Sequence, residues 1–137
     1  MPPISLIELH MAAAHFPIAL LLSSAFFDVA GVAMRRPQFR ETAFWIQWLG
    51  VVACVVTITL GLLGNPFGWS AGEMTERVVR HLSSGITSLA IFAGLAFWRV
   101  RRRNSFKGRG QLAFALVSLA GVVAVSVTGY LGAHIAR

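Results

Sequence analysis

The sequence predicts an all-α integral membrane protein, an antiparallel bundle of four transmembrane helices, and three observations lead to this fold class. Of the 137 residues, 56% are hydrophobic and only 12% are charged, whereas about a quarter of a soluble domain is charged. Four apolar runs each reach the roughly 18–24 residues that a helix needs to cross the hydrocarbon layer. None of these runs alternates between apolar and polar residues as the strands of a membrane barrel do. Helices are then the structure that can satisfy the hydrogen-bonding groups of the backbone within lipid. We therefore expect residues 1–137 to form a single transmembrane domain.

The expected spans follow one another with short connections, so neighbouring helices should be antiparallel. They cover about residues 11–34, 43–64, 81–98 and 111–135. The last three spans contain no Asp, Glu, Lys or Arg. The first contains Asp28, which we expect to pair with Arg35 or Arg36 near the membrane surface rather than to carry protons. Pro17 is expected in the first turn of a helix that begins near His15, where its missing N–H is tolerated.

The distribution of basic residues predicts how the bundle is oriented. The connections 35–42 and 99–110 hold nine of the twelve Lys and Arg residues, and the positive-inside rule assigns such loops to the cytoplasm. Both chain ends should then face outward, into the periplasm if the membrane is the inner (cytoplasmic) membrane of a Gram-negative bacterium. The basic residues stand in short blocks between apolar runs, which argues against nucleic acid as a partner and for the lipid bilayer. The two expected hairpins differ in loop length and motif content, so we expect no internal repeat.

The histidines of the chain are all expected at the outward side of the membrane. They are His10, His15, His81 and His134. Ionisable side chains at bilayer depth are costly and often functional, and imidazole is a common ligand of heme iron. Gly85 lies one turn after His81, where a residue without a side chain lets a flat macrocycle or another helix approach closely. His10 and His15 would point about 140° apart on a continuous helix, so they should not chelate one small ion. Of these two, we expect His15, fixed by the helix start, to be the firmer ligand.

Two segments carry a family resemblance, HMAAAHFPIALLLSSAFFD near the start and VTGYLGAHIAR at the end. They resemble the signature ends of a bacterial inner-membrane family of four-helix proteins that is catalogued as a domain of unknown function. Its pattern is H-P-x-x-x-H-F-P-I-A-L near the start and G-Y-L-G-G-x-L-V-Y near the end. Here Met11 replaces the usual Pro, Ala133 replaces the second Gly, and the sequence stops at Arg137 without the usual V-Y and glycine-rich tail. The resemblance spans essentially the whole chain and implies that the motif histidines are ligands, but it implies no particular activity.

The residues favour a membrane subunit that binds one or two b-type hemes through pairs of histidines and transfers electrons. The one cysteine, Cys54, lies in an apolar run and no CxxCH motif is present, so covalent heme attachment is not expected. Arg77 and Arg80 are candidates to neutralise heme propionates, and Tyr130 to bond a ligand or propionate. Because the cytoplasmic half has no histidine, electrons should be exchanged at the outer face. The expected partners are other subunits of a membrane redox complex, a periplasmic cytochrome or dehydrogenase, or a quinone.

Two other functions stay open from the sequence. One is a non-heme site for copper, iron or zinc, in which Glu8, Glu73 and Glu76 add oxygen ligands to the imidazoles. The other is a cofactor-free structural or anchor subunit in which the histidines only pack. No GxSxG, HExxH or phosphate-binding glycine loop is present, so an electron-transfer subunit is expected rather than an enzyme acting by itself.

Overall fold

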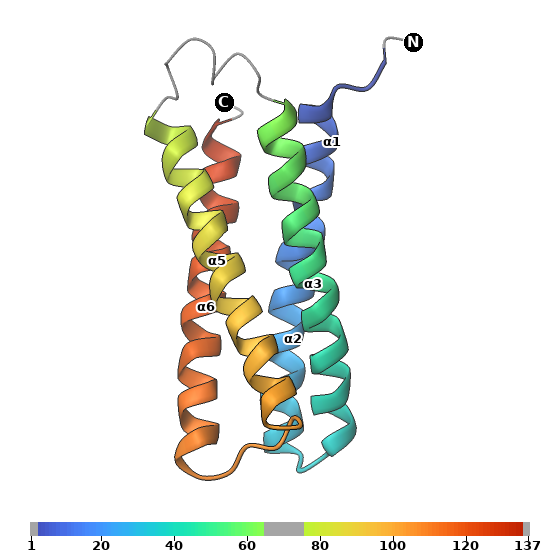
Figure 1. The fold of residues 1–137 in the computed structure, drawn as a ribbon, viewed down its shortest axis with the longest axis vertical. Coiled ribbons are helices and arrows are strands. Elements are labelled where there is room, and N and C mark those ends of the chain that lie inside the picture. The colour runs from blue at the N-terminus through green and yellow to red at the C-terminus, as the bar shows by residue number, and fades with distance from the viewer. Residues whose placement is uncertain (1–2, 65–75, 136–137) are drawn as a thin grey trace.

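A computed structural model of the chain describes residues 3–64 and 76–135, which form an antiparallel helical bundle (Figure 1). The helices are α1 (Leu6–Ala13), α2 (His15–Ala33), α3 (Pro37–Gly64), α5 (Glu76–Arg101) and α6 (Arg109–Ile135). Within residues 3–64 and 76–135, four stretches are long and apolar enough to cross a membrane, namely α1 with α2, then α3, α5 and α6. The described residues contain no strand. The predicted fold class, an all-α membrane bundle, is confirmed.

The bundle has two ends, which we name by their residues. At the histidine end lie the starts of α1 and α5 and the ends of α3 and α6 (Figure 1). At the arginine end lie the two short connections, residues 34–36 and 102–108. These connections are shorter than the predicted loops 35–42 and 99–110, because the helices continue past the apolar runs into the charged segments. An apolar run marks only the part of a helix that suits hydrocarbon, so it underestimates the full length of the helix.

The first span is built from two helices that follow one another along the bundle. The Ser5 hydroxyl and the Glu8 carboxylate bond each other's backbone N–H groups, at 3.3 Å and 2.8 Å, and so cap the start of α1. Pro17 lies in the first turn of α2, as predicted. Proline has no N–H to offer the carbonyl oxygen of Ala13 one turn earlier, and the hydroxyl of Thr57 on α3 lies 3.5 Å from that oxygen instead. The helix start and α3 are therefore joined at this point.

The helices pack most closely in two pairs, α2 with α3 and α5 with α6. The core lies between these two pairs. Glycines allow both contacts. A Cβ added to Gly50 would lie 2.6 Å from a methyl carbon of Leu21, and one added to Gly121 would lie 3.0 Å from the ring of Phe92. Most other large apolar side chains point away from the bundle, as expected of a surface that faces lipid.

The two halves of the chain are repeats of one another, contrary to the prediction. Residues 50–61 (GVVACVVTITLG) and 121–132 (GVVAVSVTGYLG) are identical at eight of twelve positions, with each pair 71 positions apart. The inward faces match at the same offset. Four of the six buried positions of α3, Ala43, Gln47, Gly50 and Cys54, have as counterparts the four buried positions of α6, Phe114, Ser118, Gly121 and Val125. The hairpins were expected to be unrelated because they differ in loop length and motif content, whereas the likeness lies in the segments 50–61 and 121–132 and in the spacing of the buried positions.

The repeats run in the same direction, since α1, which opens the first span, and α5 both start at the histidine end (Figure 1). Two residues contact their own counterparts, again 71 positions apart. His10 lies against His81, and Asp28 forms an ion pair with Arg99. A residue that touches its counterpart lies on the rotation axis that relates the two copies. The two pairs thus mark an approximate two-fold axis along the bundle, with one pair toward each end.

Candidate functional site

His10 of α1 and His81 of α5 face each other across the bundle near its histidine end. Their ring centroids are 6.2 Å apart and the ring planes are nearly perpendicular, at 87°. Both side chains are partly buried. The two histidines come from different repeats and occupy the same position in each, so together they form one shared site on the two-fold axis.

Each imidazole is held through its Nδ1 atom by a carbonyl oxygen of the neighbouring helix. His10 Nδ1 lies 2.7 Å from the carbonyl oxygen of Thr57, and His81 Nδ1 lies 3.1 Å from that of Thr128. A carbonyl oxygen only accepts hydrogen bonds, so Nδ1 must carry the proton in both rings. The Nε2 atom of a neutral imidazole then keeps its lone pair. This is how metal-binding histidines are commonly oriented.

A glycine lies against each imidazole and makes room for it. A Cβ at Gly61 would be 2.9 Å from Cε1 of His10, and a Cβ at Gly132 would be 2.9 Å from Cε1 of His81. Any side chain at either position would have to displace the ring. Because Gly61 and Gly132 are counterparts in the repeat, the site is shaped in the same way from both sides.

The surroundings of His81 are more polar than those of His10. The hydroxyl of Thr128 lies 2.7 Å from that of Ser84 and 3.2 Å from that of Ser88, both on α5. In the first repeat, Ala13 and Pro17 take the places of these serines. The hydroxyl cluster thus ties α5 to α6 beside one histidine only.

His15 and His134 do not join the pair. Both are exposed, and each Nδ1 contacts a carbonyl oxygen of its own helical segment, at 3.4 Å from Ala12 and 2.8 Å from Tyr130 respectively. The exposed ring of Tyr130 stacks on His134 with centroids 4.2 Å apart. We expected His15 to be the firmer ligand, but the structure brings His10 to His81. The five-residue spacing explains this, because it turns His15 away from the face that carries His10.

The other predicted site residues lie around the histidine end without contacting the pair. Arg77 and Arg80 are exposed, and Arg80 forms an ion pair with Glu76 one turn earlier. Glu8 belongs to the cap of α1. Glu73 lies outside the described residues. Gly85 is buried, and a Cβ there would meet the methyl group of Thr128 at 3.7 Å, so this glycine serves the contact between α5 and α6.

No third ligand stands beside the two imidazoles in the described part of the chain. Residues 3–64 and 76–135 contain no group of three or more His, Cys, Asp or Glu side chains placed to hold a metal ion. The site therefore offers two imidazole ligands.

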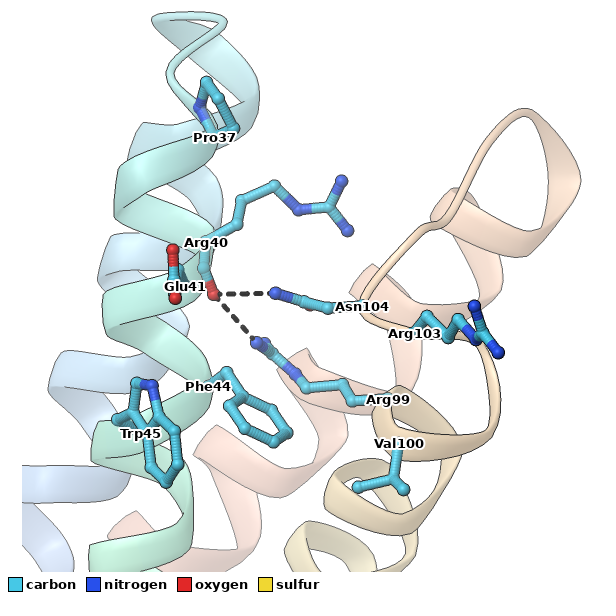
Figure 2. A pocket seen from close by; sticks show the side chains of 9 residues that line it. All are labelled: Pro37, Arg40, Glu41, Phe44, Trp45, Arg99, Val100, Arg103 and Asn104. Carbon is cyan, nitrogen blue, oxygen red and sulfur yellow. Dashed lines mark hydrogen bonds between the residues drawn. The ribbon is translucent and has the colours of Figure 1, made fainter.

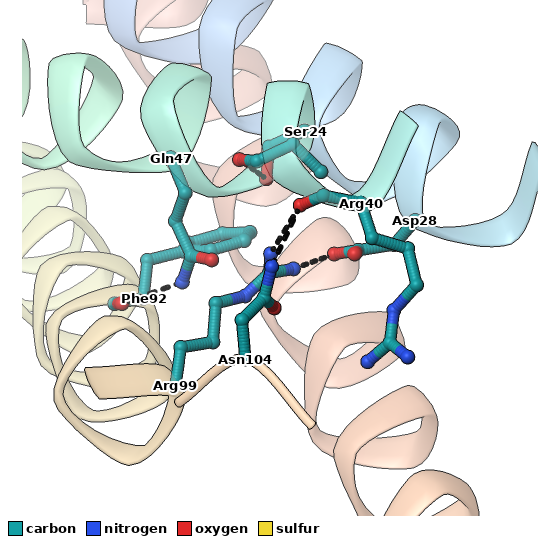
Figure 3. A network of polar contacts seen from close by, with 8 residues as sticks. Ser24, Asp28, Arg40, Gln47, Phe92, Arg99 and Asn104 are labelled. Carbon is teal, nitrogen blue, oxygen red and sulfur yellow. Dashed lines mark hydrogen bonds and ion pairs between the residues drawn. The ribbon is translucent and has the colours of Figure 1, made fainter. Parts of the chain in front are cut away.

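A second polar cluster lies inside the arginine end. The carbonyl oxygen of Arg40 accepts hydrogen bonds from Nη1 of Arg99, at 3.4 Å, and from the side-chain amide of Asn104, at 3.2 Å (Figure 2). Nη2 of Arg99 forms an ion pair with Asp28 (Figure 3). Its guanidinium also lies over the ring of Phe114, 4.6 Å from the centroid. Arg99 is 1% exposed, and is the largest fully buried side chain among the described residues.

Two predictions about this end were wrong. Asp28 does not pair with Arg35 or Arg36, since its partner is Arg99 in the opposite repeat. Arg99 does not begin a solvated loop either, because α5 continues to Arg101. Helical periodicity explains both differences. Arg99 follows Phe92 and Leu95 on the inward face of α5, and that face meets α3 and α6.

These features define a helical membrane protein made of two repeats, with one histidine pair between them. The chain belongs to the family described as "Predicted membrane protein (DUF2231)", whose model matches residues 7–137. Searches of curated proteins and of solved structures found no match. The family membership confirms the resemblance found in the sequence, and the function has to be argued from the site itself.

Proposed function

We propose that the protein is an electron-transfer subunit that binds one b-type heme between its two repeats, and that His10 and His81 would hold it. One observation supports this function most strongly. Two imidazoles from separate repeats face each other, and the Nδ1 atom of each is bonded to a carbonyl oxygen. That arrangement leaves one Nε2 lone pair on each ring for iron.

The spacing of the two rings suits a single metal ion between them. With metal–nitrogen bonds of about 2.0 Å, two imidazoles on opposite sides of one ion have ring centroids about 6.3 Å apart. The centroids of His10 and His81 are 6.2 Å apart.

Heme is favoured over a non-heme ion by the number of ligands. Heme brings four nitrogen atoms of its own and needs only two from the protein, and histidine pairs on facing helices commonly supply them. A non-heme ion usually needs three or four protein ligands. Only two imidazoles meet in the described residues. One heme per chain is proposed rather than two, because His15 and His134 are exposed and the Nδ1 of each contacts a carbonyl oxygen three or four residues earlier in the chain.

The residues around the pair would tune the bound group. The carbonyl oxygens of Thr57 and Thr128 accept the Nδ1 protons, which makes the imidazoles stronger donors and favours the oxidised state of a bound iron. Gly61 and Gly132 keep the rings from being pushed aside. Heme supplies the one-electron chemistry, while the chain positions the ligands and excludes water from them.

Electrons would be exchanged at the histidine end of the bundle. The nine basic residues of the opposite end predict that it faces the cytoplasm, so the histidine end would face the periplasm of a bacterial inner membrane. All four histidines of the chain lie near that end, so this chain alone would not carry electrons across the bilayer. The partner would be a periplasmic cytochrome or dehydrogenase, another subunit of a redox complex, or a quinone.

The test is the optical spectrum of the purified full-length protein after expression with ample heme. We expect a reduced b-type alpha band, and one heme per chain by the pyridine hemochromogen assay. The variants His10→Ala and His81→Ala should each lose the band. His15→Ala and His134→Ala are matched controls, because they remove an exposed histidine from the same end and should keep both the band and the stoichiometry.

Other outcomes would decide against the proposal. A wild-type protein without heme, or a double His10→Ala/His81→Ala variant with unchanged heme content, would overturn it. Metal analysis of a colourless preparation distinguishes a non-heme metal site, the second candidate function, from a heme site. Copper, iron or zinc that is present in the wild type and absent from the double variant would favour a non-heme site.

A further inference from the structure

A groove of about 540 Å³ opens at the arginine end, well away from the histidine pair (Figure 2). It lies between the first turns of α3 and the last turns of α5 with the connection that follows. Its lining residues are Pro37, Arg40, Glu41, Phe44, Trp45, Arg99, Val100, Arg103 and Asn104. The site is thus formed by segments from both repeats.

The groove is rich in positive charge that the protein does not neutralise. Neither Arg40 nor Arg103 forms an ion pair with any residue in the described ranges, although Glu41 also lines the groove. Arg99 forms part of the lining, and its buried Nε atom has no hydrogen-bond partner among the described residues. The groove also lies at the start of α3, where the free N–H groups of a helix favour an anion.

The backbone around the groove holds these groups in place. Arg103 and Asn104 both have positive φ angles, 48° and 55°, which turn the chain sharply after α5. Asn104 is anchored by its bond to the carbonyl oxygen of Arg40, the same oxygen that Arg99 contacts. The connection is therefore fixed to α3 through Asn104, and Arg40 and Arg103 line the groove from its two sides (Figure 2).

One side of the groove is apolar and suits an acyl chain rather than water. Trp45 is 61% exposed and Val100 is 52% exposed, although both lie within helices that are apolar enough to span a membrane. A tryptophan at such a position commonly marks the level of the lipid headgroups. A phosphate group among Arg40 and Arg103 would have its hydrocarbon chains along Trp45 and Val100.

We propose that this groove binds the headgroup phosphate of an anionic phospholipid. The excess of arginine at this end predicts that it faces the cytoplasmic leaflet, where anionic lipids attract basic segments. Basic pockets between transmembrane helices on that side are typical headgroup sites. A bound headgroup would add its own contacts to both repeats and would hold α3 and the α5–α6 connection together. The proposal does not depend on whether the histidine pair binds heme.

The experiment measures lipid binding to the detergent-purified full-length protein by native mass spectrometry. The probes are dioleoylphosphatidylglycerol and, for comparison, the uncharged dioleoylphosphatidylcholine. The test variant is Arg40→Gln/Arg103→Gln, which keeps the aliphatic stems and removes both charges from the groove. The matched control is Arg101→Gln/Arg102→Gln, which removes two charges from the same end outside the lining.

Each arginine near an anionic surface contributes a factor of about five in binding, so the loss of two predicts about thirtyfold weaker binding of phosphatidylglycerol. The control variant should stay within about threefold of the wild type, and phosphatidylcholine should bind weakly to all three proteins. Equal losses in the two variants, or equal binding of the two lipids, would refute the lipid site. Competition by millimolar inorganic phosphate would instead assign the groove to a soluble phosphate and would also overturn the proposal.

A second measurement applies even if the groove variant does not fold. Phosphatidylglycerol with brominated acyl chains quenches nearby tryptophan fluorescence, so part of the emission of the otherwise unaltered protein should be quenched. That component should disappear in Trp45→Phe. Quenching that is unchanged in Trp45→Phe would show that the acyl chains do not lie along this side of the groove.

Discussion

The ion pair between Asp28 and Arg99 allows the sharpest test of the structure. The Arg99 side chain has no exposed surface and that of Asp28 is 13% exposed. Loss of one partner from a buried pair leaves an uncompensated charge and typically costs 3–5 kcal/mol. In the variant Asp28→Leu, Arg99 would keep its bond to the Arg40 carbonyl and its contact with the Phe114 ring. We therefore expect the low part of that range, about 3 kcal/mol.

The double variant Asp28→Leu/Arg99→Leu distinguishes pairing from packing. Replacing both charges by apolar side chains removes the cost of burying them, so the double variant should unfold within about 1 kcal/mol of the wild type. The exchange Asp28→Arg/Arg99→Asp should also recover part of the loss, because the two positions are counterparts on the two-fold axis. Its recovery should be incomplete, since the contact of Arg99 with Phe114 has no equivalent after the exchange.

The assay is unfolding of the full-length protein in mixed micelles with increasing sodium dodecyl sulfate, followed by tryptophan fluorescence. The free energies of the wild type, the two single variants and the double variant form a double-mutant cycle. Single-variant costs that simply add in the double variant would refute the pairing of Asp28 with Arg99. A cost below about 1 kcal/mol for Asp28→Leu would refute the burial of the pair.

Two further predictions concern the histidine end. In Gly61→Ala and in Gly132→Ala, the added methyl group would lie 2.9 Å from His10 or His81, so heme content measured by the hemochromogen assay should fall by at least half. Gly94→Ala is the control, because nothing lies within 4 Å of its added Cβ, and it should leave heme content unchanged and stabilise the helix by up to about 1 kcal/mol. Thr128→Val should cost about 1–2 kcal/mol in the micelle assay, because it removes the hydroxyl that bonds two serines of α5. It should nevertheless keep the histidine site, since His81 is bonded to the backbone carbonyl of this residue, and loss of heme in this variant would contradict that arrangement.

The fold could be predicted because composition and length suffice for it. Four apolar runs of membrane-spanning length admit few arrangements other than a bundle when the connections between them are short. The helix ends could not be predicted in the same way. Arg99 stands in the basic run RVRRR, and composition does not separate it from the three arginines that follow. Its helical phase does separate it, since Phe92, Leu95 and Arg99 share one face.

The candidate site could be predicted only in part. Topology places the four histidines at one end, and the five-residue spacing shows that His10 and His15 point apart. Neither observation shows whether His10 or His15 points into the bundle. That depends on the rotation of α1 about its own axis, which is set by its packing against α3, including the contact of His10 with Gly61. The segments 50–61 and 121–132 are the sequence signal that identifies His10, because their offset of 71 positions pairs it with His81.

The repeat explains why the two ends of the bundle differ in chemistry. At the histidine end the axis carries two identical groups, and the proposed heme would be held by the same residue from both repeats. At the arginine end the axis carries a buried pair of charges, and two equal charges at counterpart positions would repel each other at close range. An ion pair of Asp28 with Arg99 is therefore possible only where the two copies differ in sequence. A dimer of identical hairpins could form the histidine pair but not this ion pair, whereas two repeats joined in one chain can hold both.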